Sequence, residues 1–247
     1  MRHIVALSGG KDSTAMALRL QETEPSIDYE FVITPTGNEL PDMIGHWKRV
    51  EGLLGKPLQA VSNGVSLLSE ARRQQCLPNH RMRWCTRLLK IEPFQVHLLG
   101  AAPCTSYVGI RADEVADRDG VDHETIGEGI TNRYPLVEWG WGVADVHGYL
   151  REKEVTIPRR TDCGLCFFQR MVEWWTLWKE HPDLYEEGVQ LERDIGFTFR
   201  SEKKDSWPAS LADLREAFKG GRTPRHAGQL KMFTSDNRSA MCAWCAR

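Results

Sequence analysis

A glycine-rich loop close to the first residue constrains the fold of this chain more than any other feature. The loop covers residues 8–14 and reads Ser-Gly-Gly-Lys-Asp-Ser-Thr. A short apolar run at residues 3–7 precedes it, as expected of a strand buried on both faces, and residues 15–20 have the apolar spacing of a helix. Free N–H groups at the start of that helix, together with the helix dipole, favour an anion. The order of strand, glycine loop and helix therefore predicts a phosphate site.

The side chains of the loop suit a nucleotide phosphate. Its glycines let the backbone approach a phosphate closely, and Lys11 adds a mobile positive charge. Asp12 is unusual in a pure anion site and indicates magnesium or a structural hydrogen bond. The alternative interpretation is a tight turn capped by Ser8. The predicted nucleotide-binding residues of the loop are Ser8, Gly9, Gly10, Lys11, Asp12, Ser13 and Thr14.

Strands and helices alternate along the first 155 residues, which predicts an α/β fold with a Rossmann-like parallel sheet flanked by helices. Polar residues follow three of the expected strands: the glycine loop, residues 34–39, and Arg111 with Asp113. Because ligands of parallel sheets bind at the carboxyl ends of the strands, these residues are expected to meet at one edge. Further strands are expected at residues 29–34, 58–61 and 106–110, and helices at 42–54 and 86–99, the latter with a break at Pro93.

The chain changes character after Val155, so we expect two domains, 1–155 for nucleotide binding and 156–247 as a helical region with metal-binding cysteines. Helices are expected at residues 167–179, 182–194 and 211–218. The tryptophan-rich first helix is expected to pack on the sheet or on the metal cluster, and a surface that stacks on nucleic-acid bases is the alternative.

Two Cys-x-x-Cys pairs, Cys163 with Cys166 and Cys242 with Cys245, indicate metal or redox chemistry. This spacing lets two thiolates face one metal ion, and four thiolates suit tetrahedral zinc or an iron–sulfur cluster. The total of seven cysteines is odd, which argues against a disulfide framework. No apolar run is long enough to span a membrane and no signal-peptide pattern is present, so we expect a cytoplasmic protein with reduced thiols.

The glycine loop resembles the PP-loop of the ATP pyrophosphatase (adenine nucleotide alpha hydrolase) superfamily, whose signature is Ser-Gly-Gly-x-Asp-Ser. Its spacing differs from the Walker pattern. The resemblance implies a sheet of the PP-loop/HUP type. It also implies ATP with Mg²⁺ as cofactor, and cleavage of ATP to AMP and pyrophosphate that adenylates an acceptor.

Four further segments resemble the PAPS reductase-like family of that superfamily, and the similarity runs from about residue 3 to 170. The resemblance implies that Thr36, Gly37 and Glu39 lie near ribose, adenine or magnesium, and that Gly109 and Arg111 meet phosphate or the acceptor. Lys11, Asp12 and Arg111 are the expected catalytic residues, and Asp113 and Glu114 are expected to bind magnesium or to orient Arg111. The four segments are residues 36–41, 83–86 with Lys90 and Pro93, 109–114, and 134–139.

Two departures from that family bear on the reaction. APS and PAPS reductases generally have a degenerate glycine loop, whereas Lys11 and Asp12 are intact here. They also end in Glu-Cys-Gly, whereas this tail reads Cys-Ala-Trp-Cys. We therefore expect ATP-dependent adenylation that serves iron–sulfur-assisted sulfur transfer. The alternatives are a sulfonucleotide reductase with Cys242 or Cys245 as nucleophile, and a non-enzymatic nucleotide sensor or nucleic-acid-binding module with structural zinc.

Similarity to APS reductases implies a [4Fe–4S] cluster bound by Cys85, Cys163 and Cys166, because Cys85 aligns with the first cysteine of their Cys-Cys pair. The fourth ligand would be Cys242 or Cys245, or the fourth position would stay open. The competing arrangement places zinc on the two Cys-x-x-Cys pairs and leaves Cys85 free near the nucleotide.

Net charge does not identify the acceptor. The chain has 32 Lys and Arg against 34 Asp and Glu, a net charge of −2, which offers no argument for binding nucleic acid or a membrane. Expected partners are ATP or a sulfonucleotide, an acceptor that is a nucleic acid, a metabolite or a carrier protein, and a protein that donates sulfur or electrons.

Overall fold

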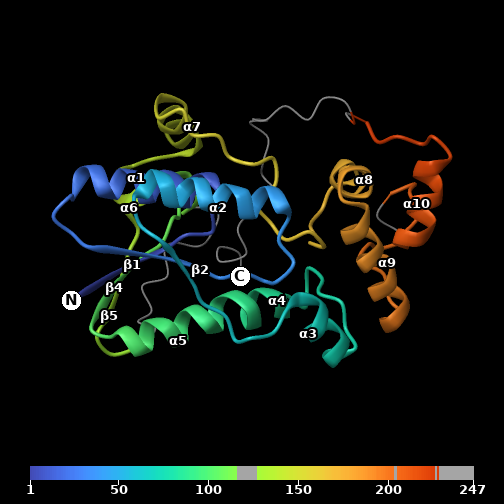
Figure 1. Cartoon of the computed structure of the whole chain (residues 1–247), viewed down its shortest axis with the longest axis horizontal. Coiled ribbons are helices and arrows are strands. Elements are labelled where there is room, and N and C mark those ends of the chain that lie inside the picture. Colours follow the sequence, from blue (N-terminus) through green and yellow to red (C-terminus); the bar gives the residue numbers. More distant parts are fainter. Residues whose placement is uncertain (116–126, 203–204, 226, 228–247) are drawn as a thin grey trace.

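Five parallel strands form one sheet in the computed structural model, which describes residues 1–115, 127–202, 205–225 and 227 (Figure 1). The spatial order is β3-β2-β1-β4-β5. The fold is the α/β class predicted from the sequence, a Rossmann-like parallel sheet flanked by helices. The strands are β1 (Arg2–Ala6), β2 (Tyr29–Ile33), β3 (Leu58–Ala60), β4 (Cys104–Tyr107) and β5 (Ile130–Arg133).

The strand order reverses at β1. From β1 the chain passes to β2 and β3 on one side, and then returns to β4 on the other side of β1. In open α/β sheets such a reversal opens a crevice at the carboxyl ends of the two strands concerned, and ligands bind there. The glycine loop leaves β1 at this point and residues 108–111 leave β4, so the topology brings both polar segments to one place.

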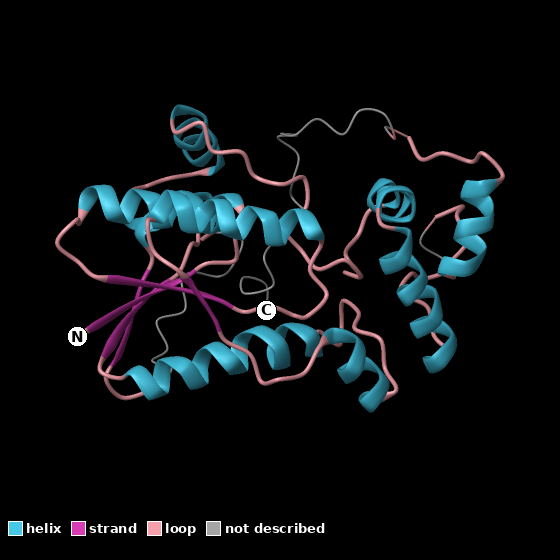
Figure 2. Cartoon of the chain, in the orientation of Figure 1, coloured by secondary structure: helices cyan, strands magenta, loops and turns pink. Residues whose placement is uncertain are grey.

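The two faces of the sheet are covered by different helices (Figures 1 and 2). Val5 and Phe31 point toward one layer, and their neighbours Ile4 and Val32 point toward the other, as the alternation of a strand requires. The first layer contains α1 (Lys11–Thr23), α2 (Pro41–Leu54), α6 (Pro135–Glu138) and α7 (Val143–Glu152), and α5 (Glu92–Ala101) covers the second face.

The break predicted at Pro93 is a widened helical turn. A short helix, α4 (Trp84–Thr86), continues through a π-helical turn, η1 (Arg87–Ile91), into α5. Pro93 lacks an N–H group and cannot complete an ordinary α-helical turn, and a local π-helical turn accommodates this without ending the helix.

A second core forms where the carboxyl-terminal helices meet α3 (Leu67–Gln74). Trp174 of the tryptophan-rich helix is fully buried there, so this helix packs into the second core and not on the sheet, which was one of its two predicted positions. That helix begins at Met171, later than predicted. Residues from both sides of position 155 share this core, and the domain boundary there stays a prediction. The helices are α8 (Met171–Glu180), α9 (Pro182–Ile195) and α10 (Leu211–Lys219).

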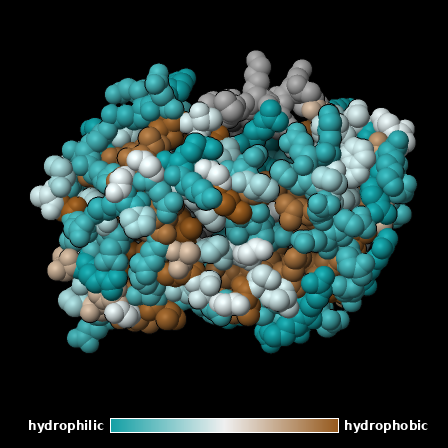
Figure 3. All heavy atoms as spheres, viewed as in Figure 1, coloured by the Kyte–Doolittle hydropathy of each residue, from teal (hydrophilic) through white to brown (hydrophobic). Residues whose placement is uncertain are grey.

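Polar and apolar residues are mixed on the face shown in Figure 3. Exposed apolar side chains occur on α2, at Ile44 and Leu53, and on α5, at Val96 and Leu99. Among the described helices, none combines the length and apolar character that crossing a membrane would demand.

A buried carboxylate joins the carboxyl-terminal helices. Glu192 on α9 is 6% exposed. Its Oε1 accepts a hydrogen bond from the N–H of Phe199 at 2.9 Å, and its Oε2 accepts one from the N–H of Leu211 at 2.6 Å. Burial raises the pKa of Glu192 to about 7. The side chain therefore provides an acceptor for the backbone N–H of Phe199, which follows α9, and for that of Leu211, the first residue of α10.

We expect the Glu192→Ala substitution to lower the free energy of unfolding by about 2–4 kcal/mol, because two buried N–H groups lose their acceptors. Urea unfolding measures the change. Glu187→Ala, an exposed position on the same helix, is the matched control and should change stability by less than about 0.5 kcal/mol. Equal losses in the two variants would contradict the structural role of Glu192.

Candidate functional site

The glycine loop turns sharply between β1 and α1. Gly9 has φ +80°, a conformation that residues with a side chain rarely adopt. Ser8 Oγ accepts a hydrogen bond from the N–H of Gly10 at 3.2 Å and lies 3.0 Å from Ser13 Oγ. Helix α1 begins at Lys11 without a side-chain cap, so the N–H groups of its first turn are available to an anion.

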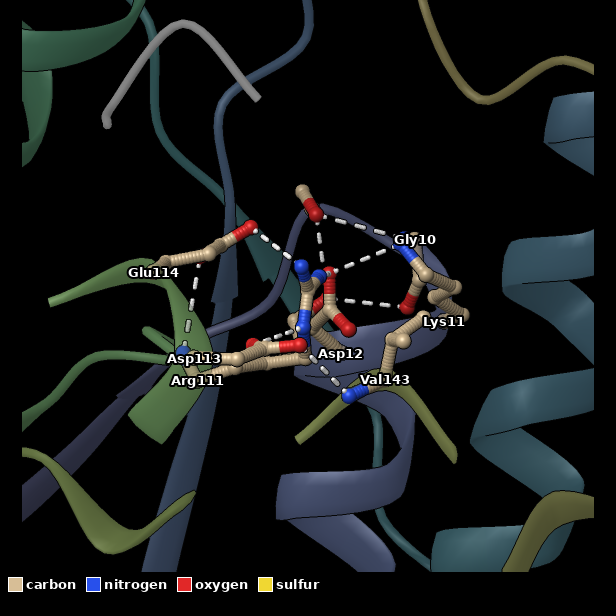
Figure 4. A network of polar contacts seen from close by, with 9 residues as sticks. Gly10, Lys11, Asp12, Arg111, Asp113, Glu114 and Val143 are labelled. Atoms are coloured by element: carbon tan, nitrogen blue, oxygen red, sulfur yellow. Dashed lines mark hydrogen bonds and ion pairs between the residues drawn. The ribbon is translucent and has the colours of Figure 1, made fainter. Parts of the chain in front are cut away.

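Arg111 contacts three carboxylates at this point (Figure 4). Its Nη1 lies 2.9 Å from Asp12 Oδ2, its Nε 2.8 Å from Asp113 Oδ1, and its Nη2 2.9 Å from Glu114 Oε1. Lys11 Nζ lies 3.1 Å from the same Asp12 oxygen. The three residues predicted to be catalytic, Lys11, Asp12 and Arg111, therefore meet although Arg111 lies 99 positions from Asp12 in the chain.

Electrostatics favour the charged forms of Arg111 and Asp113. Burial opposes the charge of Arg111, but Asp12 and Glu114 outweigh burial and raise the pKa of the guanidinium. Burial likewise opposes the charge of Asp113, but the N–H of Val143 and Arg111 outweigh it and lower the pKa of that carboxyl. Val143 N donates to Asp113 Oδ2 at 3.0 Å, which joins the start of α7 to the network.

The segment after β2 forms a small turn of its own. Glu39 Oε1 accepts hydrogen bonds from the N–H and the Oγ1 of Thr36, both at 2.6 Å. Gly37 between them has φ +70°. Thr36 and Glu39 both line the cavity next to the glycine loop. Oε1 of Glu39 is thus already hydrogen-bonded within the protein.

Gly109 lies where β4 passes the first turn of α1. A Cβ atom at this position would come within 3.2 Å of Ser13 Cα and 3.3 Å of Ser13 N. Glycine therefore permits the close approach of the two backbones, and Gly109 also lines the cavity.

Asn38 connects the turn after β2 to the first Cys-x-x-Cys pair. Its backbone oxygen accepts a hydrogen bond from Gly164 N at 2.6 Å, and its Oδ1 accepts one from Leu165 N at 2.9 Å. An isolated antiparallel bridge joins Glu39 to Cys163. A Cβ atom on Gly164 would lie 3.3 Å from Asn38 O, so the contact favours glycine between the two cysteines. Asn38 itself is 4% exposed.

Two more buried polar side chains bind the cysteine loop from the other side. Arg160 donates to Cys163 O at 2.8 Å and to Gln169 Oε1 at 2.9 Å, and Gln169 Nε2 donates to Gly164 O at 2.6 Å. Buried polar groups of a loop are costly unless they are hydrogen-bonded, and these contacts satisfy them. These hydrogen bonds therefore hold the loop that carries Cys163 and Cys166 in place.

Cys85, Cys163 and Cys166 line the same cavity as the glycine loop, which has a volume of about 190 Å³. A hydrogen bond with Cys163, together with burial, raises the pKa of the Cys166 thiol well above its ordinary value, and burial raises the pKa of Cys85. As the side chains stand, no three His, Cys, Asp or Glu residues of the described chain are grouped closely enough to bind a metal ion. The three thiols that line this cavity still have the donor chemistry of a thiolate-bound metal group. Cys242 and Cys245 lie outside the described residues.

Two residues of α2 that sequence reasoning missed contact the glycine loop. His46 Nε2 lies 3.0 Å from Gly9 O, and Trp47 Nε1 donates to Ser8 O at 3.3 Å. A signal for His46 was present in the sequence, because it interrupts the apolar spacing of Met43, Val50 and Leu54 on the buried face of the helix. Asn38, Arg160 and Gln169 gave no comparable signal, because their partners are distant in the chain.

Comparisons with known proteins identify relatives of this chain. Residues 2–162 match the model of the phosphoadenosine phosphosulfate reductase domain. A search of curated proteins found no match. The structure is similar to that of U34-tRNA thiolase NcsA from Methanococcus maripaludis with its [4Fe-4S] cluster, with 17% sequence identity and a TM-score of 0.52 over 87% of this chain and 80% of that one. It also matches phosphoadenylyl-sulfate (PAPS) reductase from Candida auris in a phosphate complex, with 20% identity and a TM-score of 0.47 over 64% of this chain and 75% of that one.

We expect Asn38→Ala to loosen the cysteine loop, because Leu165 N loses its acceptor. Cys163 and Cys166 should then react with a thiol-alkylating reagent about five- to tenfold faster in the reduced, metal-free protein. Mass spectrometry of the labelled peptides measures both rates. Asn63→Ala, an exposed loop position, is the control, and an equal change in the two variants would contradict the link.

Proposed function

The chain belongs to the phosphoadenosine phosphosulfate reductase domain family of the PP-loop superfamily, and we propose that it cleaves ATP to AMP and pyrophosphate to adenylate an acceptor, and that sulfur then replaces the AMP. The observation that carries the proposal is the network of Lys11, Asp12 and Arg111 at the start of α1. Its two cations lie where the strand order reverses, beside N–H groups that suit phosphates.

The residues of the loop would bind the triphosphate, with Ser8 to Thr14 around it. Lys11 and Arg111 both pair with the same oxygen of Asp12. When a nucleotide binds, its phosphate oxygens would replace the Asp12 carboxylate as the partner of each cation. Asp12 Oδ1 is buried and accepts no hydrogen bond from the described residues, which suits an oxygen ligand of Mg²⁺. Thr36, Glu39 and Gly109 line the same cavity and would complete the nucleotide site, with Gly37 in the turn between the first two.

The reaction would proceed in two displacements. An acceptor oxygen attacks the α-phosphorus, the bond to the bridging oxygen breaks, and pyrophosphate leaves with the electron pair. A sulfide-level donor then attacks the carbon that bears the adenylate, and AMP leaves with the oxygen. Lys11 and Arg111 would stabilise the charge that develops on pyrophosphate, and positioning of the two reactants would supply much of the remaining rate.

We propose that Cys85, Cys163 and Cys166 bind an iron–sulfur group beside the nucleotide. All three thiols line the cavity that the glycine loop also lines. The structurally similar U34-tRNA thiolase NcsA carries a [4Fe-4S] cluster, which makes this the preferred group. A group bound here would supply a site for sulfur close to the adenylated acceptor. In this proposal residues 1–155 bind the nucleotide and residues 156–247 contribute most of the metal-binding cysteines.

Reduction of a sulfonucleotide is the second candidate, and the family match favours it. It would use a cysteine of the final Cys-x-x-Cys pair as nucleophile. The intact Lys11 and Asp12 of the loop favour ATP instead. Sulfite release from APS or PAPS with a thioredoxin-like reductant distinguishes the two reactions.

We expect Lys11→Ala to lower pyrophosphate release from ATP by about 100-fold or more, because the cation next to the phosphates is lost. Pyrophosphate is measured with nucleic acids, metabolites and carrier proteins offered in turn as acceptors. Lys48→Ala, an exposed lysine on α2, is the control and should retain the wild-type rate. An unchanged rate in Lys11→Ala would rule out the proposed role of the loop.

Metal analysis of protein purified without oxygen tests the cysteine assignment. We expect near-stoichiometric iron and acid-labile sulfide in the wild type, and a loss of both in Cys85→Ser. Cys76→Ser is the matched control and should keep the wild-type content, because the Cys76 thiol donates to Leu77 O outside the cavity. Zinc alone, with the same content in Cys85→Ser, would instead favour the two Cys-x-x-Cys pairs as a structural zinc site.

A further inference from the structure

Helix α2 presents two adjacent hydrogen-bond donors to the glycine loop. His46 contacts the carbonyl oxygen of Gly9 at 3.0 Å, and Trp47 contacts that of Ser8 at 3.3 Å. The carbonyl oxygen of Gly9 can only accept a hydrogen bond, so Nε2 of His46 carries the hydrogen. Each of two consecutive peptide units in the loop is therefore bound to α2 through its oxygen.

The buried imidazole of His46 has one partner among the described residues. The side chain is 1% exposed, and its Nδ1 makes no hydrogen bond with any of them. Burial, together with the charge of Arg49, lowers the pKa of His46 to about 4, so the ring is neutral near pH 7. A buried polar ring costs free energy, and its single hydrogen bond is to the loop.

The direction of these carbonyl groups decides the direction of the loop N–H groups. In a planar trans peptide the C=O and the next N–H point in opposite directions. Since the oxygens of Ser8 and Gly9 point toward α2, the N–H groups of Gly9 and Gly10 point away from it, and the N–H of Gly10 donates to Ser8 Oγ at 3.2 Å. Consecutive N–H groups on one side of a turn form a concave site for an anion, whereas carbonyl oxygens there would repel it.

The fit between α2 and the loop leaves no room for a side chain on Gly9. A Cβ atom there would lie 2.2 Å from Met43 Cε and 2.7 Å from Trp47 Nε1. The loop thus packs directly against Met43, His46 and Trp47 of α2.

We propose that His46 and Trp47 are positioning residues that bind the carbonyl oxygens of Gly9 and Ser8 and so aim the N–H of Gly9 at the anion, while the N–H of Gly10 stays bonded to Ser8 Oγ. The inference rests on the proposed function for the identity of that anion, the pyrophosphate part of a nucleotide. The orientation of the loop itself follows from the contacts with α2.

The test compares His46→Phe, which removes the donor, with His46→Gln, whose Nε2 can still donate to Gly9 O. Trp47→Phe keeps a ring but removes the second donor, and provides a second variant if His46→Phe fails to fold. His97→Gln is the control, since His97 lies on α5 beside Arg2 and Glu30. Two properties are measured on the full chain: hydrogen exchange of the amides of Gly10 and Thr14, which both bond within the loop, and binding of inorganic pyrophosphate and of ATP.

We expect His46→Phe to speed exchange of both amides and to weaken pyrophosphate binding about tenfold, with Trp47→Phe showing a smaller change in the same direction. His46→Gln should recover most of both properties at an unchanged melting temperature. Wild-type exchange in His46→Phe, or faster exchange with unchanged pyrophosphate affinity, would overturn the inference. If the wild type binds neither ATP nor pyrophosphate, the proposed function fails, while faster exchange in His46→Phe alone would still support the loop orientation.

Discussion

The site depends on the junction between β1 and α1, where the strand order reverses. Because β2 and β4 lie on opposite sides of β1, the segments that follow all three strands meet at the glycine loop. Each adds a different kind of group: backbone N–H groups and Lys11 after β1, the Thr36 turn after β2, and Arg111 after β4. A sheet in sequential order would leave no crevice at this point, since its connections would run in one direction across it.

Charge compensation stabilises the polar network at the start of α1. Two cations, Lys11 and Arg111, share Asp12, and Arg111 also contacts Asp113 and Glu114. An unpaired buried guanidinium would cost several kcal/mol, so these carboxylates are needed before any phosphate arrives. Asp12, which seemed out of place in an anion site, thereby has a structural role that agrees with the alternative considered for it.

Hydrogen bonds to backbone groups place the cysteine loop beside the nucleotide site. Asn38, Arg160 and Gln169 each bind main-chain atoms of residues 163–165, so the loop stays in place through contacts that do not involve its thiols. Cys163 and Cys166 are thereby left to line the cavity. A similar arrangement occurs at the glycine loop, where α2 binds the carbonyl oxygens of Ser8 and Gly9 and the N–H of Gly9 points away from the helix.

Sequence alone determined the features that contiguous residues decide. The strand at residues 3–7, the strands at 29–34 and 58–61, and the helices at 42–54 and 182–194 all follow from local apolar spacing and turn residues, and the structure has each of them within three residues at either end. The helix read at residues 15–20 also forms, but it begins four residues earlier, at Lys11. Strand β5 and α3 were not predicted, because β5 is short and half-exposed and α3 carries few apolar residues.

Tertiary structure alone decided which polar residues meet. Arg111 reaches Asp12 across 99 positions and Asn38 reaches Leu165 across 127, and no local pattern encodes a partner at such a distance. The buried position of His46 was readable from the helix face, but its acceptor was not, since the loop and α2 come together through the pairing of β1 with β2 in the sheet.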